Sequence, residues 1–118
     1  MASFYYLASP FSKYPKGRKQ AYKDICIMTD FLEHKGLFVF SPISHSYGIE
    51  KHGKDGLKYD YEWRLSKDFY FLEQSRGLIV VKMENWEESF GVQEEIKYAH
   101  YLDKPVYYTE FMELPIGW

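Results

Sequence analysis

Two acidic residues occupy positions where a helix is expected to face the protein interior. Residues 91–99 resemble the opening of a helix, and the spacing i, i+3, i+4, i+7 places four residues on its inward face: Val92, Glu95, Ile96 and Ala99. A carboxylate is rarely buried unless it is paired or functional. Glu95 is therefore a candidate catalytic residue, and an acid at the edge of the apolar stripe that reaches solvent is the alternative.

A second predicted helix carries an acid in the equivalent position. Over residues 61–72 the inward positions are Leu65, Asp68, Phe69 and Leu72. Taken alone, Asp68 is better explained as an acid at the edge of the stripe. Together with Glu95 it suggests a carboxylate pair in one cleft, and such pairs perform glycosidic chemistry, with one carboxylate as nucleophile and the other as acid or base.

The strands and helices that must position these acids alternate along the chain. The expected elements are a strand at residues 4–8, a helix at 17–35, a strand at 37–40, a helix at 60–74, a strand at 77–82, a helix at 89–102 and a strand at 106–108. Residues 41–59, rich in Gly, Ser, His and Lys, are predicted to form a long loop.

This alternation predicts an α/β fold, a doubly wound parallel sheet of four to five strands in a flavodoxin/Rossmann-like three-layer sandwich. Glu95 lies about one turn into the helix that follows the apolar run at residues 77–81, and ligands of such sheets bind beyond the carboxyl ends of the strands. The sequence has neither the dinucleotide-binding glycine fingerprint nor the phosphate-loop motif.

Length and composition limit the classes of function. The 118 residues are expected to form a single domain spanning residues 1–118. The 15 basic and 17 acidic residues give a net charge of −2, which gives no support for binding a nucleic-acid polymer or a membrane. One cysteine excludes an internal disulfide, and the first residues do not resemble a signal peptide, so a cytoplasmic protein is expected.

The remaining polar candidates have structural alternatives. The histidines at 34, 45, 52 and 100 lack the spacing of a metal site, so neither a metal nor a cofactor is expected. His45 could contact a base or phosphate, or make only local hydrogen bonds. Ser89 is suited to cap a helix, and a helix N-terminus also attracts phosphate. The basic run Lys13, Lys16, Arg18 and Lys19 could clamp a phosphate, although a solvated loop is the commoner use.

Three segments of the chain resemble a known superfamily. The segments are Tyr5–Pro10, Phe40–Ser46 and Ser89–Ala99, and together they are similar to the nucleoside 2-deoxyribosyltransferase-like superfamily, most closely to short members with no firmly assigned substrate. The most specific element is Ser-x-Gly-Val-x-x-Glu at residues 89–95. It resembles the motif of the deoxynucleotide N-glycosidases, in which the final Glu is the nucleophile.

The resemblance implies roles for individual residues. Glu95 would attack the anomeric carbon, Asp68 would assist the departing base or hold the sugar, and Tyr6 would contact the sugar or the nucleophile. Ser89 would bind a 5′-phosphate or nearby oxygens. Gly91, Ser9 and His45, which lie in the matching segments, complete the candidate substrate-binding residues.

The chain departs from the superfamily pattern at three places. The loop after the first strand is Ser9–Ser12 and a basic run, where the nucleotide hydrolases are glycine-rich. Arg76 stands where many relatives carry an acid, and the turn before Ser89 is longer and contains Trp86. The identity of the substrate therefore does not carry over.

The expected function is cleavage or transfer at the N-glycosidic bond of a (deoxy)nucleoside or its 5′-monophosphate, through a covalent glycosyl-Glu95 intermediate. The alternatives are another N-ribosyl hydrolase, of the nicotinamide nucleotide type, and a non-catalytic nucleotide-binding module. Relatives complete the cleft with a neighbouring subunit, so a homodimer or larger homo-oligomer is expected, and the aromatic content of 20% is consistent with subunit contacts.

Overall fold

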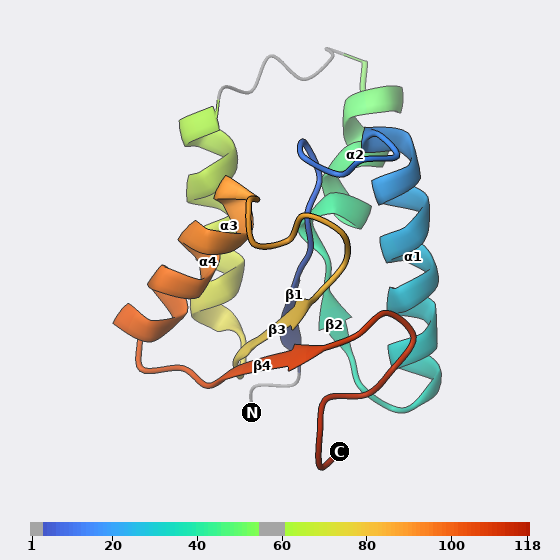
Figure 1. The fold of residues 1–118 in the computed structure, drawn as a ribbon. Helices are drawn as coiled ribbons and strands as arrows, with labels where there is room; N and C mark the ends of the chain where they lie inside the picture. Colours follow the sequence, from blue (N-terminus) through green and yellow to red (C-terminus); the bar gives the residue numbers. More distant parts are fainter. Residues whose placement is uncertain (1–3, 55–60) are drawn as a thin grey trace.

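The computed structural model describes residues 4–54 and 61–118, in which a parallel sheet lies between helices on its two faces (Figure 1). In chain order the elements are β1 (Tyr5–Ala8), α1 (Arg18–His34), β2 (Val39–Phe40), α2 (Pro42–His52), α3 (Tyr61–Gln74), β3 (Leu78–Val81), α4 (Phe90–Tyr101) and β4 (Val106–Thr109). The α/β prediction is confirmed, and the described sheet has four strands.

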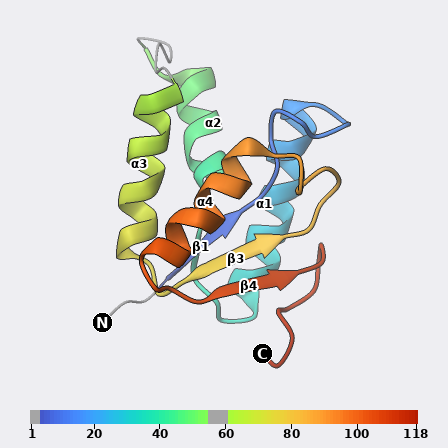
Figure 2. The same ribbon diagram turned by 60° about the vertical axis from the view of Figure 1, so that its left-hand side comes forward.

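Alternating apolar side chains on the central strands create two cores, one on each face of the sheet. Successive residues of a strand point to opposite faces. On one face Leu7, Ile79 and Val81 pack with the apolar stripe of α1, which comprises Ala21, Ile25, Met28 and Leu32. On the other face Tyr6, Ala8, Leu78 and Val80 pack with Leu72 of α3 and with Val92 and Ala99 of α4. Helices α3 and α4 lie side by side over this second face (Figure 2).

The order of the strands determines where a ligand site forms. The sheet runs β2-β1-β3-β4 and all pairs are parallel. This is the flavodoxin-like order, in which the chain leaves β1 and β3 toward opposite faces, so a crevice opens beyond their carboxyl ends. The two loops at this crevice are the one that follows β1 and the one that leads from β3 into α4.

The prediction of a loop over residues 41–59 is wrong for its first part. Residues 42–52 form α2, because Ser41 caps the helix with its hydroxyl, which accepts a hydrogen bond from the Ser44 N–H at 3.2 Å. Pro42 occupies the first turn, where its missing N–H has no cost. Residues 55–60, including the predicted helix start at Asp60, lie outside the described residues.

The other predicted boundaries agree with the structure to within two residues. Helix α1 begins after Gly17, whose φ of 93° suits glycine, and it ends before Gly36, which has a φ of 88°. Within the described part of the chain, no helix combines the length and apolar character that crossing a membrane requires.

Candidate active site

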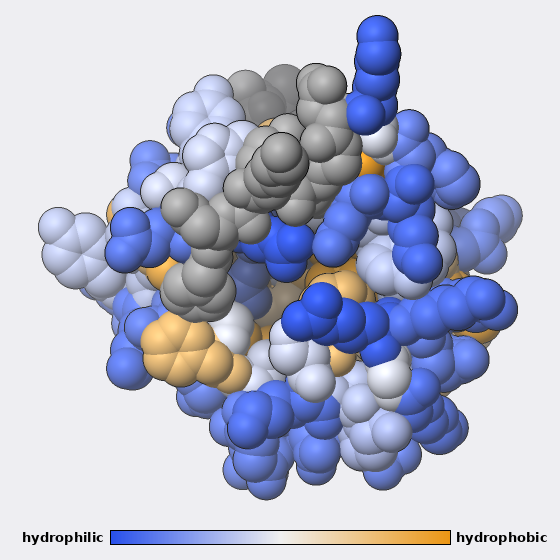
Figure 3. All heavy atoms as spheres, turned by 90° about the horizontal axis from the view of Figure 1, so that it is seen from above, coloured by the Kyte–Doolittle hydropathy of each residue, from blue (hydrophilic) through white to orange (hydrophobic). Residues whose placement is uncertain are grey.

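A cavity of about 250 Å³ opens beyond the carboxyl ends of β1 and β3. The loop after β1, helices α2 and α3, and the start of α4 all contribute to its lining. Seen from this end of the sheet, the molecule is hollowed near its centre, where apolar surface is visible between hydrophilic side chains (Figure 3). The cavity therefore lies at the crevice that the strand order predicts.

Glu95 is the buried acid of this cavity. Its side chain lies on α4 with only 6% of its surface exposed, on the same face as Val92 and Ala99, as the sequence pattern predicts. Its Oε2 accepts a hydrogen bond from the hydroxyl of Tyr6 on β1. Tyr6 is fully buried, and its ring packs against Phe40 of β2 with the centroids 5.9 Å apart. The sheet therefore holds the Glu95 carboxylate through a rigid phenol.

Burial controls the protonation of Glu95 and Tyr6. Loss of water raises the pKa of Glu95 from 4.5 to about 8; the Tyr6 hydrogen bond opposes this shift, and the charge of Asp68 adds to it. The pKa of Tyr6 lies well above its ordinary value, because of burial and because of the negative charges of Glu95 and Asp68. Near neutral pH the ligand-free pair therefore keeps the phenol neutral and favours a proton on Glu95.

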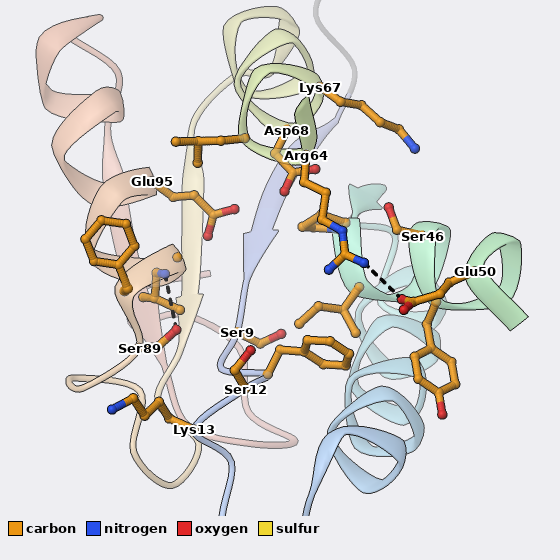
Figure 4. A pocket seen from close by; sticks show the side chains of 18 of the residues that line it. Ser9, Ser12, Lys13, Ser46, Glu50, Arg64, Lys67, Asp68, Ser89 and Glu95 are labelled. Carbon is orange, nitrogen blue, oxygen red and sulfur yellow. Dashed lines mark hydrogen bonds and ion pairs between the residues drawn. The ribbon is translucent and has the colours of Figure 1, made fainter. Parts of the chain in front are cut away.

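Asp68 faces the same cavity from α3 (Figure 4). Its burial raises its pKa from 3.8 to about 6, while the positive charges of Lys67 and Arg64 oppose the shift. The two predicted carboxylates thus line one cavity from two helices, and the charge of Asp68 raises the pKa of Glu95. Two carboxyl groups with separated pKa values are the arrangement that acid–base and nucleophilic chemistry at a sugar requires.

The start of α4 forms one end of the cavity. Ser89 is the N-cap, and its hydroxyl accepts a hydrogen bond from the Val92 N–H at 3.3 Å. Gly91 lines the cavity, and a Cβ atom built on it would meet no atom within 4 Å. The capping role of Ser89 is confirmed, and contact with a phosphate stays a prediction.

Two buried polar atoms without a hydrogen-bond partner belong to residues that line the cavity. Among the described residues these atoms are the hydroxyl of Ser9 and the Nε of Arg64, and both residues line the cavity. Buried polar groups in proteins are normally paired, so these two atoms are exceptions. Ser9 was expected at the site; Arg64, one helical turn before Asp68, was not.

The other candidates lie partly outside the cavity lining. His45, on α2, does not line the cavity; its ring lies beside Phe40 and Phe71, at 5.4 and 6.1 Å between centroids. Partial burial and the charge of Lys67 lower its pKa. Of the basic run, Lys13 lines the cavity, whereas Arg18 stacks on the ring of Phe11 at 5.3 Å.

The described residues contain no group of three or more His, Cys, Asp or Glu side chains placed to hold a metal ion.

The comparison with protein families gives a match over most of the chain. The family is described as a domain of unknown function, DUF1937, and its model matches residues 4–111. The chain belongs to this family. The family description names no activity, so the resemblance to the nucleoside 2-deoxyribosyltransferase-like superfamily stays a prediction. No curated protein matches the chain.

Proposed function

We propose that this member of the DUF1937 family cleaves or transfers the N-glycosidic bond of a (deoxy)nucleoside or its 5′-monophosphate, with Glu95 as nucleophile. The observation that carries the proposal is the buried Glu95 carboxylate, bonded to the Tyr6 hydroxyl and facing the same cavity as Asp68. A carboxylate beside the anomeric carbon stabilises an oxocarbenium-like transition state and can then trap the sugar as an ester.

The protonation of the pair supports a defined proton path. In the ligand-free protein the proton favours Glu95, which has the higher pKa, over Asp68. Attack requires the reverse arrangement, with Glu95 ionised and Asp68 protonated. On substrate binding the proton passes from the Glu95 carboxyl group to Asp68. Asp68 then donates it to the departing base while Glu95 bonds to the anomeric carbon. The active free enzyme therefore carries one proton on the two carboxyl groups.

The end of the cavity at α4 suits the 5′ side of the substrate. The unpaired Ser9 hydroxyl, the ammonium group of Lys13 and the N-terminus of α4 at Ser89 all border it (Figure 4). Hydroxyl donors, a lysine and a helix N-terminus together favour a phosphate oxygen over a neutral hydroxyl. This arrangement supports a 5′-monophosphate as the better substrate.

We also propose that the protein acts as a homodimer or larger homo-oligomer. A row of aromatic rings runs across α3 and α4 toward the surface. The half-buried rings of Phe69 and Tyr98 stack with their centroids 4.1 Å apart, and the centroids of Tyr98 and Tyr101 are 5.8 Å apart. Tyr101 is 80% exposed. Exposed aromatic side chains are enriched at subunit contacts. Light scattering at micromolar concentration tests this proposal, and a monomer would contradict it.

The catalytic proposal is tested by chromatography of the free base released from a panel of substrates. The panel contains deoxynucleosides, their 5′-monophosphates, the ribose counterparts and a nicotinamide nucleotide. Release by wild type should be lost in Glu95→Gln and retained in Glu94→Gln, a change on the same helix at a residue that does not line the cavity and pairs with Lys97. Absence of release from every substrate, with and without an acceptor base, would contradict catalysis and favour a binding module.

A further inference from the structure

Arg64 crosses the cavity from α3 and contacts α2 on the other side. Its Nη2 lies 3.4 Å from Oε2 of Glu50, and the side chains of the two residues are 35% and 34% exposed. Figure 4 shows the guanidinium between Asp68 and Glu50, inside the ring of cavity-lining residues. The pair therefore forms one wall of the cavity, next to the proposed proton donor.

The ion pair satisfies only part of the guanidinium. Arginine has five N–H donors in a fixed plane, and the Nε of Arg64 is buried without a hydrogen-bond partner. A buried donor without an acceptor is unfavourable, so the guanidinium is not fully satisfied by Glu50. The Nε atom is itself enclosed by protein atoms, so a ligand in the cavity meets the guanidinium at its accessible part. Because a guanidinium has only N–H donors, the ligand atom that suits this position is an acceptor.

The position of Arg64 along α3 places this acceptor on the leaving base. Arg64 precedes Asp68 by four residues, so the two side chains lie on the same face of the helix, one turn apart. Asp68 faces the base in the proposed reaction, so the group beside Asp68 contacts the base and not the 5′ side. The neighbouring lining residues Trp63, Ile43 and Ile49 supply apolar surface suited to a planar ring.

We propose that Arg64, oriented by Glu50, donates a hydrogen bond to the carbonyl oxygen at C6 of a purine or C4 of a pyrimidine, and makes the site selective for 6-oxopurines and for uracil or thymine over adenine and cytosine, which carry an amino group at that position. This inference rests on the proposed N-glycosidic function. It adds a specificity residue to the reaction and a class of base to the substrate.

The chemistry of the bond cleavage explains the preference. As the bond between C1′ and the base nitrogen breaks, its electron pair moves onto the base, and in an oxo base part of that charge reaches the carbonyl oxygen. Arg64 stabilises the charge there, Asp68 delivers the proton to the ring nitrogen, and Glu95 forms the new bond to C1′. An exocyclic amino group instead presents N–H donors toward a group that has only donors.

The test uses two substrates that differ at the relevant position of the base. They are 2′-deoxyinosine, with an oxygen on C6, and 2′-deoxyadenosine, with an amino group there, each also as its 5′-monophosphate. The wild-type protein is expected to prefer the oxo substrate in kcat/KM by about 100-fold, because a site built for a hydrogen bond strongly rejects a substrate that cannot make it.

Arg64→Lys keeps the charge and removes the planar fork, so it should lower kcat/KM for deoxyinosine by about 100-fold and for deoxyadenosine by less than about threefold. Glu50→Gln should change the same ratio in the same direction by about tenfold, because Glu50 only orients the guanidinium. Arg76→Lys is the matched control. It lies at the opposite end of the sheet, over the ring of Tyr5, and should leave both substrates unchanged.

The outcomes separate this inference from the proposed function. Release by wild type that Glu95→Gln abolishes, with a base preference that neither Arg64→Lys nor Glu50→Gln alters, would overturn the inference and leave the function standing. A wild-type preference for deoxyadenosine would also overturn it. No release from any substrate would remove both. Calorimetric titration of Glu95→Gln with deoxyinosine, with and without Arg64→Lys, gives a second readout; equal affinities would count against the role of Arg64.

Discussion

Burial of Glu95 should make the stability of the fold depend on pH. The folded-state pKa is about 8, against 4.5 for a solvated glutamate, so between these values the unfolded chain releases a proton that the folded protein retains. The stabilisation from this difference is fully present below about pH 4.5 and is lost as pH rises through the folded pKa. The free energy of unfolding should fall by about 1.4 kcal/mol per pH unit in this window, or roughly 4–5 kcal/mol in total.

Glu95→Gln isolates this effect, because the amide has nearly the same shape, cannot ionise, and can still accept the Tyr6 hydrogen bond. Urea denaturation of wild type and variant at about pH 5, 7 and 9 measures it. The stability of the variant relative to wild type should increase by about 1.4 kcal/mol per unit up to about pH 8 and then level off. Glu94→Gln is the control, and its difference from wild type should stay flat, because the carboxylate of Glu94 reaches solvent beside Lys97.

A difference between Glu95→Gln and wild type that does not change with pH would refute the reasoning, because it would mean that Glu95 is ionised in both states. If the Tyr6 hydrogen bond, which favours the carboxylate, outweighed the desolvation that favours the acid, the folded-state pKa would lie below 4.5. The difference would then be flat from pH 5 to 9 and would decrease with rising pH only below about pH 4.5.

Three further substitutions test the site. A pH–rate profile of wild-type kcat/KM should follow a bell with limbs near pH 6 and 8. Tyr6→Phe removes the hydrogen bond that lowers the Glu95 pKa, so the alkaline limb should move upward and the maximum should fall about tenfold for each unit by which that pKa rises. Unchanged limbs would contradict this. Ser9→Ala removes an unpaired buried hydroxyl, so thermal unfolding of the free protein should show no loss of stability, while KM for the 5′-monophosphate rises about tenfold; a destabilised protein with normal KM would disprove the binding role. Gly91→Ala should stabilise α4 by about 0.5–1 kcal/mol in denaturant titrations and raise KM, because the new methyl enters the cavity; an unaltered KM would show that substrate stays clear of this turn.

The position of Glu95 could be predicted because helical spacing alone determines the face of α4. Val92 and Ala99 are buried as expected, and the acid between them is buried with them. The contact with Tyr6 follows from the resemblance and from strand alternation, since Tyr6 and Leu7 must point to opposite faces of the sheet.

Helix α2 and its contribution to the cavity could not be predicted from composition. Its glycine, serine and histidine residues are typical of a loop, and the helix signal was confined to Ser41 and Pro42. Missing the helix also hid Glu50, because its partner Arg64 lies on another element and the sequence contains no information on their distance. Arg64 itself had a usable signal, its spacing of four residues from Asp68.

The two walls of the cavity are anchored to the sheet very differently. Tyr6 belongs to β1, which pairs with strands on both sides, whereas α2 follows β2, an edge strand of two residues. Amide hydrogens of β1 should therefore exchange with deuterium only when the whole domain unfolds. Those of α2 should exchange through local openings that require less free energy. A bound ligand therefore adds little to the protection of the β1 amide hydrogens from exchange, because that protection is already maximal. In a hydrogen–deuterium exchange experiment, occupancy of the cavity should accordingly be seen in α2 and the first turns of α3, while the exchange of β1, the strand that holds Glu95 through Tyr6, should not change.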